Sequence, residues 1–210
     1  MNKIERIENE NDVTLSVGRG ALSTAIRSVV GAISKDVTRS HINALRVEFD
    51  GKTLRFIATD GHRLHTSLLD LSGPKEEFSY AASLTSDEAK LLEKVVKCAK
   101  RDHDQALTVR LNGKLEITGP VNATFKMDHE TSFPPWKQVL VDKGDEGENN
   151  AAGIAQYNAK YVSDAMKSAA LLGDGVYWSM SKDALAPARV DAHDSEGVLE
   201  FTAVIMPMRM

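Results

Sequence analysis

Apolar positions along the chain switch repeatedly between the alternation of a strand and the three-to-four spacing of an amphipathic helix. The same order occurs three times: a short strand, a helix with one apolar face, and three further strands. The helices begin roughly 70 residues apart, which indicates an internal repeat. The pattern predicts an α+β fold of repeated β-α-β-β-β modules, with the helices on one face of antiparallel sheets.

The three modules have predicted bounds that follow from this spacing. In the first we expect a strand at 13–17, a helix at 18–35 and strands near 43–49, 53–59 and 62–69. In the second we expect a strand at 78–82, a helix at 85–101 and strands near 106–111, 114–118 and 121–127. In the third we expect a strand at 152–156, a helix at 157–171 and strands near 174–180, 185–191 and 198–206.

Turn and cap residues agree with these bounds. The dipeptides Asp50-Gly51 and Asn112-Gly113 are typical of hairpin turns. Thr85, followed by acidic residues, predicts the cap of the second helix, and Asn158 predicts the cap of the third.

One segment separates the third module from the first two. Residues 142–150 are acidic and contain no apolar residue, which is typical of a linker. We therefore expect a polar N-terminal tail at 1–12, one domain of two modules at 13–141, this linker, and a single module at 151–210 that stands apart.

Basic residues lie on the solvent side of each predicted helix. In the second helix they repeat at i, i+4, i+7 and i+11, nearly opposite the apolar stripe. The basic set is Arg19, Arg27, Lys35, Lys90, Lys94, Lys97, Arg101, Lys160 and Lys167. For any single helix, a solvated face is a sufficient explanation. Three helices of the same polarity, in a chain of net charge −4, also fit a surface that faces phosphates.

Composition and motifs exclude several classes of protein. With 42% hydrophobic and 27% charged residues the chain is of ordinary globular composition, and no apolar run reaches the roughly 18 residues of a membrane span. The polar N-terminus is unlike a signal peptide, and a single cysteine, Cys98, fits a reducing compartment, so we expect a cytoplasmic protein.

The residue types that usually act in catalysis or metal binding do not form a recognisable active site in this sequence. His41, His62 and His65 lack the spacing and the ligand company of a zinc site, and no glycine-rich phosphate loop or Ser-His-Asp set is present. We expect no enzymatic activity, no metal and no cofactor. An enzyme that uses His62 beside Asp60 is a minor alternative, because Asp60-Gly61 is explained as a hairpin turn.

Three motifs carry a resemblance to a known family. The C-terminal residues 204–210, Val-Ile-Met-Pro-Met-Arg-Met, are apolar where chain ends are usually polar, and predict a last strand that feeds methionines into a groove; a final core strand is the alternative. Residues 58–64 read Ala-Thr-Asp-Gly-His-Arg-Leu, and residues 133–140 read Phe-Pro-Pro-Trp-Lys-Gln-Val-Leu. Together they resemble the bacterial DNA polymerase III β sliding clamp family.

The resemblance implies a DNA clamp fold and a peptide-binding groove. The groove positions carried over are Ile42, Thr59, Gly61, His62, Arg63, Leu64, Pro134, Gln138, Val139, Val204, Met206, Pro207, Met208 and Arg209. Gln138 departs from the family's usual arginine, and Met210 from its usual leucine. A short extended peptide would insert one or two large apolar side chains between cationic rim residues, which include Arg63 and Arg209.

The resemblance also implies partners and an assembly. Family members turn their helices inward around duplex DNA, without sequence specificity, and bind DNA polymerase and other clamp-binding peptides; a clamp loader is a possible further partner. They have six modules per chain and twelve per ring, whereas this chain has three, which resemble the middle domain and the second half of the last. A lone third module leaves an unpaired sheet edge, so we expect a homo-oligomeric ring of four chains. The alternative is a clamp-fold binding module that does not encircle DNA and competes for or modulates clamp-binding partners.

Overall fold

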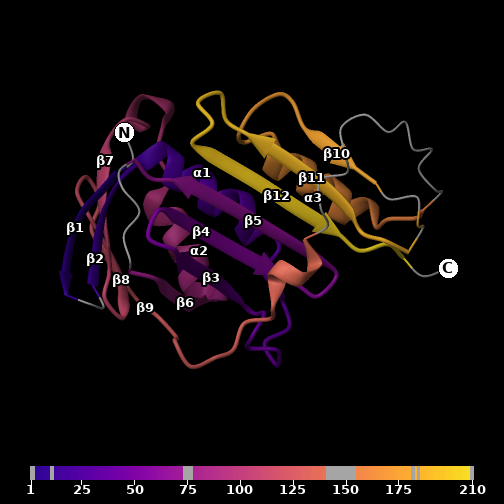
Figure 1. Ribbon diagram of the computed structural model, residues 1–210, viewed down its shortest axis with the longest axis horizontal. Helices are drawn as coiled ribbons and strands as arrows, with labels where there is room; N and C mark the ends of the chain where they lie inside the picture. Colours follow the sequence, from indigo (N-terminus) through magenta and orange to yellow (C-terminus); the bar gives the residue numbers. More distant parts are fainter. Residues whose placement is uncertain are drawn as a thin grey trace.

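The computed structural model describes residues 3–9, 12–72, 78–140, 155–180, 183 and 185–208. This part of the chain forms two antiparallel sheets and three α-helices (Figure 1). The predicted α+β fold with helices and antiparallel sheets is confirmed. The predicted linker at 142–150 and most of the strand predicted at 152–156 lie outside the described residues.

The elements follow the predicted order closely. The five-stranded sheet, β1-β2-β7-β8-β9, consists of β1 (Lys3–Asn9), β2 (Asp12–Gly18), β7 (Ala106–Leu111), β8 (Lys114–Thr118) and β9 (Ala123–Lys126). The seven-stranded sheet, β10-β11-β12-β5-β4-β3-β6, consists of β10 (Tyr177–Ser179), β11 (Ala188–His193), β12 (Leu199–Ile205), β5 (Arg63–Asp70), β4 (Thr53–Thr59), β3 (Ala44–Phe49) and β6 (Tyr80–Thr85). The helices are α1 (Arg19–Val30), α2 (Ser86–Val96) and α3 (Ala159–Ala169), with short 3-10 turns η1 (Lys100–Asp102) and η2 (Trp136–Val139).

The first two modules complete each other by exchanging their first strands. β2, which opens the first module, pairs with β7 of the second, and β6, which opens the second, pairs with β3 of the first. Buried apolar residues of both sheets, α1 and α2 form one continuous core. Each sheet would lack a strand without the other module, so the two modules form one folding unit.

The three helices lie along the same side of the seven-stranded sheet (Figure 1). α1 packs against β4 and β5, α2 against β3 and β6, and α3 against β11 and β12, while α1 contacts both other helices. On α1 the core side chains Leu22, Ile26 and Val29 are fully buried, at the spacing of one helix face.

The third module extends the sheet of the first instead of standing apart. β12 pairs antiparallel with β5 in a register that runs from Leu199 opposite Leu69 to Ile205 opposite Arg63. The last residues of β12 are apolar and buried, and the pairing covers the backbone groups that an open β5 edge would expose. The single module predicted at 151–210 is thus joined to the first module by a shared sheet.

The predicted polar tail also differs from the structure, because residues 3–9 form β1 and pair with β2. The register of this pair shifts twice, after Ile4 and after Ile7. Such bulges break the two-residue alternation by which a strand is recognised in a sequence.

Two helices end five residues earlier than predicted. α1 stops before Gly31, whose carbonyl accepts a hydrogen bond of 2.7 Å from the guanidinium of Arg63. α2 stops at Val96, because the guanidinium of Arg19 donates to the carbonyls of Val96 (3.3 Å) and Lys97 (2.9 Å). In both helices, terminal carbonyls accept hydrogen bonds from side chains of other elements. The apolar periodicity of a helix gives no information about such contacts, so it could not predict these ends.

The predicted caps and turns are confirmed. The hydroxyl of Thr85 accepts from the backbone N–H of Glu88 (3.3 Å), whose carboxylate accepts from the backbone N–H of Thr85 (3.2 Å). The side chain of Asn158 accepts from an N–H in the first turn of α3 (3.0 Å). Gly51 and Gly113 have φ values of 91° and 84°, which suit hairpin glycines.

Candidate peptide-binding groove and helix face

Five segments that are distant in the sequence meet where β5 begins and β12 ends. They are the loop before β3, the β4–β5 hairpin, the stretch 133–140, the start of α3 and the residues that follow β12. Together they line three adjoining hollows of about 280, 120 and 590 Å³. Gly61 borders all three hollows, and we refer to the combined surface as the groove.

The predicted groove residues come together on this surface. Those in the described part that border at least one hollow are Ile42, Thr59, Gly61, His62, Arg63, Leu64, Pro134, Gln138, Val139, Val204, Met206, Pro207 and Met208. Arg209, also predicted, and the terminal Met210 lie outside the described residues. The motifs that carried the resemblance therefore belong to one continuous surface.

The β4–β5 hairpin fixes the centre of the groove. The carboxylate of Asp60 accepts from the backbone N–H groups of the two residues after Gly61, at 3.0 and 3.1 Å, and the hydroxyl of Thr59 accepts from the N–H of Gly61 at 3.1 Å. Gly61 has a φ of 91°, a conformation that favours glycine. A Cβ at this position would lie 3.2 Å from the guanidinium of Arg39, so a side chain here would require the Arg39 side chain to shift.

An apolar cluster forms the floor of the groove. Ile57, Leu64, Trp136 and Val204 are buried against one another, although they come from β4, β5, η2 and β12. The indole N–H of Trp136 donates to the carboxylate of Glu48 at 3.3 Å. This contact anchors the stretch 133–140 on the sheet, because a buried indole N–H needs an acceptor.

The residues after β12 are fixed by backbone hydrogen bonds, whereas their side chains are partly exposed. The N–H of Met206 donates to the carbonyl of His62 (2.9 Å), and the N–H of Met208 donates to the carbonyl of Gln156 (2.7 Å). The side chains of Met206 and Met208 are nevertheless 40% and 46% exposed. Two flexible thioethers thus border the groove on a fixed backbone, which suits a surface that adapts to varied apolar ligands.

Arg63 differs from its predicted place at the rim. Its side chain is only 7% exposed and its guanidinium donates to Asp60 (3.1 Å), Asp164 (2.8 Å) and the carbonyl of Gly31 (2.7 Å). The same group lies 4.6 Å from the centre of the Tyr161 ring. Its hydrogen bond is the main reason that the pKa of Asp164 lies below its usual value. Arg63 is therefore a structural link between the hairpin, α1 and α3.

Several residues of the groove were not predicted as site residues. They are Arg39, His41, Pro135, Trp136, Asn158 and Tyr161. The ring of Tyr161 stacks on that of His62, with centres 6.4 Å apart. Pro135 and Trp136 stood inside a motif that was already recognised. Arg39 and Tyr161 had no such signal, because they reach the groove only through the packing of a loop and of α3.

The predicted basic positions are mostly exposed on the helix side of the sheet. The exposed members are Arg27, Lys35, Lys90, Lys94, Lys97, Arg101, Lys160 and Lys167. Lys90 lies 3.2 Å from Asp87 in a surface ion pair. Lys35 lies past the end of α1, and Lys97 and Arg101 lie past the end of α2, so the predicted line along one helix is interrupted.

Arg19 is a further correction to the predicted basic set. Its guanidinium donates to two carbonyls at the end of α2, and to the side chain of Gln105 at 3.2 Å. These contacts join the start of α1 to the end of α2. Arg19 is therefore used inside the fold and is not a free cation on its surface.

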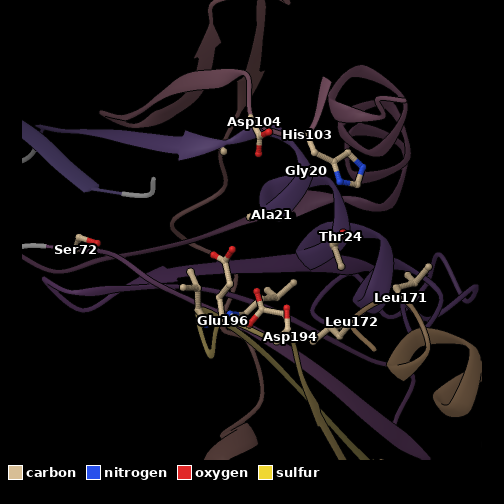
Figure 2. Close-up of a pocket in the computed structure, with 14 residues that line it drawn as sticks. Gly20, Ala21, Thr24, Ser72, His103, Asp104, Leu171, Leu172, Asp194 and Glu196 are labelled. Atoms are coloured by element: carbon tan, nitrogen blue, oxygen red, sulfur yellow. Dashed lines mark hydrogen bonds between the residues drawn. The ribbon is translucent and has the colours of Figure 1, made fainter. Parts of the chain in front are cut away.

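Another hollow, of about 380 Å³, lies at the opposite end of β5 and β12 (Figure 2). Asp104, Asp194 and Glu196 border it. The start of α1 also borders it, but the first two N–H groups of that helix donate to the carbonyls of residues 105 and 103. Acidic walls and occupied N–H groups do not suit an anion, and we assign no ligand to this hollow.

The described residues do not assemble an obvious catalytic site. Asp60, the candidate partner of His62, uses both carboxylate oxygens for the hairpin and for Arg63. Burial raises the pKa of Cys98, which disfavours the reactive thiolate. Within the described ranges, no three His, Cys, Asp or Glu side chains are placed to hold a metal ion, and no helix is long and apolar enough to span a membrane.

Comparison with known proteins identifies the family. The sequence model of the DNA polymerase III beta subunit, central domain, matches residues 16–122, just over half of the chain. The chain belongs to the DNA polymerase III beta subunit family. A curated member, the beta sliding clamp of Pseudomonas aeruginosa, is 25% identical over 139 residues, which are 66% of this chain and 37% of that relative. The match thus spans little more than a third of the relative's length.

Solved structures of beta subunits share the fold. The crystal structure of the Pseudomonas aeruginosa DNA polymerase III subunit beta superposes with a TM-score of 0.75 at 19% identity, covering 98% of this chain and 69% of that one. The Thermotoga maritima beta subunit gives 0.73 at 16% identity, covering 98% and 68%. The predicted resemblance to the sliding clamp family and the predicted clamp fold are both confirmed.

Proposed function

We propose that this chain is a sliding clamp, a non-enzymatic processivity factor of DNA replication in the cytoplasm. In this proposal a ring of chains surrounds duplex DNA without sequence preference. DNA polymerases and other partners bind the groove through short peptides, and a clamp loader places the ring on DNA. Family membership and the fold support the proposal, and the convergence of five distant segments on one apolar groove is the observation that carries it.

The groove suits an extended peptide with large apolar side chains. Its central hollow is walled by Leu64, Val139, Val204 and Met206, which offer apolar surface but few hydrogen-bonding groups. Buried apolar anchors of this kind dominate the affinity of peptide complexes. Backbone groups at the edges, and exposed side chains such as Arg39, would hold the rest of the peptide.

Peptide binding tests this proposal directly. The probes are fluorescent hexapeptides with two large apolar residues, compared with peptides in which both are serine. We expect binding by the apolar peptides alone, and a loss of roughly tenfold, equal to about 1.4 kcal/mol, when Pro207→Ala and Met208→Ala are combined. Leu91→Ala is the matched control, because Leu91 is as exposed as Met208 but lies on α2. Equal binding by all three proteins would exclude the groove as the binding site.

The exposed basic residues support the DNA part of the proposal. Arg27, Lys94, Lys160 and Lys167 lie on three adjoining helices on one side of the sheet. Cations on such a surface attract phosphates without reading bases. The attraction is weak and salt-dependent, which is what sliding along DNA requires.

The module count supports a ring of four chains. One chain supplies three modules, so a ring of twelve modules needs four copies. Native mass spectrometry should then find an assembly of four times the 22.9 kDa of one chain. A monomer as the sole species at micromolar concentration would contradict the ring.

The alternative is a clamp-fold binding module that does not encircle DNA. The reduced number of cations that remain available to bind phosphates favours it. Arg19 is bound to carbonyls, Lys90 is paired with Asp87, and Arg101 lies 3.8 Å from Asp102. Three of the nine predicted cations therefore already have partners within the fold. Such a module would compete for clamp-binding partners through the same groove. It would bind the hexapeptides equally well but would dissociate from circular and linear DNA at the same rate.

A further inference from the structure

The turn between β7 and β8 contains the one Asn-Gly dipeptide of the sequence, and the proposed function makes no use of it. β7 ends at Leu111 and β8 begins at Lys114, so Asn112 and Gly113 form the turn of this hairpin in the five-stranded sheet (Figure 1). Asparagine is a thermally labile residue, because its side-chain amide can react with the backbone nitrogen of the next residue. The reaction depends on how the fold holds these two groups.

Neither reacting group is held in place in this turn. Among the described residues the side chain of Asn112 has no hydrogen-bond partner, although its Oδ1 is buried. The hydrogen bond within the turn runs from the backbone N–H of Asn112 to the carbonyl of Lys114 (3.2 Å), so it does not engage the N–H of Gly113. A Cβ built at Gly113 would meet nothing within 4 Å. The amide can therefore rotate toward an unobstructed nitrogen.

The other asparagines whose side chains the structure describes differ in both respects. The side chain of Asn43 donates to the carbonyl of Ser34 (2.6 Å). Those of Asn122 and Asn158 accept from backbone N–H groups at 3.3 and 3.0 Å. Each of the three is followed by alanine, whose Cβ hinders approach to the backbone nitrogen, whereas glycine has no Cβ. The fold thus distinguishes Asn112 from these residues.

We propose that Asn112 is a site of spontaneous deamidation in the folded protein. The backbone nitrogen of Gly113 forms a bond to Cγ of Asn112, the bond from Cγ to Nδ2 breaks, and the proton of the attacking N–H leaves with Nδ2 as ammonia. Water, the only co-reactant, then adds to one carbonyl of the resulting cyclic imide and breaks its C–N bond. Opening at Cγ gives aspartate and opening at the main-chain carbonyl gives isoaspartate. In both products a neutral amide has become a carboxylate.

Both products should weaken the β7–β8 hairpin. Oδ1 of Asn112 is buried without a partner among the described residues, so the aspartate product places part of a carboxylate where burial disfavours charge. The isoaspartate product adds a methylene to the main chain, next to the pair formed by Leu111 and Leu115. This modification goes beyond the proposed function and does not rest on it, because it needs neither DNA nor a peptide.

Peptide mapping by mass spectrometry tests the site. The protein is incubated at mildly alkaline pH, and circular dichroism checks that it stays folded throughout. Conversion should appear at Asn112 well before it appears at Asn43, Asn122 or Asn158, and it should give a mixture of aspartate and isoaspartate. Conversion at Asn112 that is no faster than at Asn122 would overturn the proposal.

Two glycine variants test the attacking nitrogen. Gly113→Ala should slow the conversion of Asn112 several-fold, because the added Cβ hinders the attack. Gly197→Ala is the matched control, because Gly197 also has a positive φ and open space around its Cβ position but lies in another hairpin. It should leave the rate unchanged. Equal rates in the wild type and in Gly113→Ala would also overturn the proposal.

Urea unfolding tests the effect on the hairpin. Asn112→Asp reproduces one product and should lower the urea midpoint. Asn122→Asp adds the same charge but still offers an acceptor to the N–H of Gly119, so it should keep the wild-type midpoint. A wild-type midpoint for Asn112→Asp would contradict the predicted weakening.

Discussion

The guanidinium of Arg63 joins three parts of the fold that are far apart in the sequence. It binds Asp60 in its own hairpin, the carbonyl of Gly31 at the end of α1, and Asp164 on α3. The sequence motif predicted that Arg63 belongs to the groove, but it did not contain these partners. Because α3 also supplies Tyr161 to the groove, the shape of the groove depends on this buried cation.

Substitutions at this link should affect stability and peptide binding together. Arg63→Lys keeps the charge but cannot reach three acceptors, and should lower the free energy of unfolding by about 2 kcal/mol. Asp164→Asn should cost about 1 kcal/mol, because the other two acceptors remain. Urea unfolding measures both, and both variants should bind the apolar hexapeptides more weakly than the wild type. Asp87→Asn removes an exposed pair instead and should change neither quantity. If Asp164→Asn behaves like Asp87→Asn, α3 is not positioned by Arg63.

His65 should make the stability of the fold depend on pH. It is fully buried, with Nδ1 3.1 Å from the carbonyl of Ser28, and burial lowers its pKa to about 4. In the unfolded chain the pKa is about 6.5, so only the unfolded chain gains a proton between these values. The contribution of His65 to the free energy of unfolding should be constant above pH 6.5. It should fall by about 3 kcal/mol as the pH drops from 6.5 to 4.

Urea unfolding at pH 7.5 and pH 4.5 measures this loss. His65→Asn keeps a donor near Nδ1 but does not titrate, so it should lose much less stability between the two pH values. His41→Asn, at an exposed histidine, should behave like the wild type. Equal losses in all three proteins would show that other groups control the pH dependence.

At the scale of elements, local signals predicted the hairpins and caps well. Asp60-Gly61 and Asn112-Gly113 identified turns in which the glycines have positive φ. The ends of α1 and α2 were not predictable, because Arg63 and Arg19 terminate these helices from other elements. The pairing of β12 with β5 was not predictable either, since strand alternation defines the faces of a strand but not its neighbour.

The β4–β5 hairpin allows stability and binding to be separated. Gly61→Ala and Gly113→Ala both place a side chain at positive φ, and each should cost about 1 kcal/mol of stability. At Gly113 the added Cβ meets open space, whereas at Gly61 it meets Arg39. Only Gly61→Ala should therefore weaken hexapeptide binding, as measured by fluorescence anisotropy. Equal binding by both variants would place the peptide away from the hairpin.

The helix face makes a prediction about salt. Lys94, Lys97, Lys160 and Lys167, changed together to Gln, should lower the affinity for duplex DNA and flatten its salt dependence. The slope of log K against log[salt] should fall by about 0.9 for each phosphate that the variant no longer neutralises. Lys114→Gln with Lys126→Gln, on the five-stranded sheet, should have little effect. Loss of affinity from the sheet variant instead would assign DNA to the other face.

At the scale of the whole molecule, the sequence predicted three modules and the residues of one groove. It did not predict that the third module continues the sheet of the first, which places the tail after β12 beside the β4–β5 hairpin. The groove thus exists because the two parts share a sheet.

The most direct test of a clamp is its dependence on DNA topology. The protein, loaded on a nicked circular plasmid and passed over a gel-filtration column at moderate salt, should stay with the DNA. Cutting the plasmid once should release the protein, because a closed ring slides off a free DNA end. A protein bound only by charge would be retained equally before and after the cut. Retention on the circle and loss from the linear form is the predicted result; equal retention or equal loss on both would contradict the account.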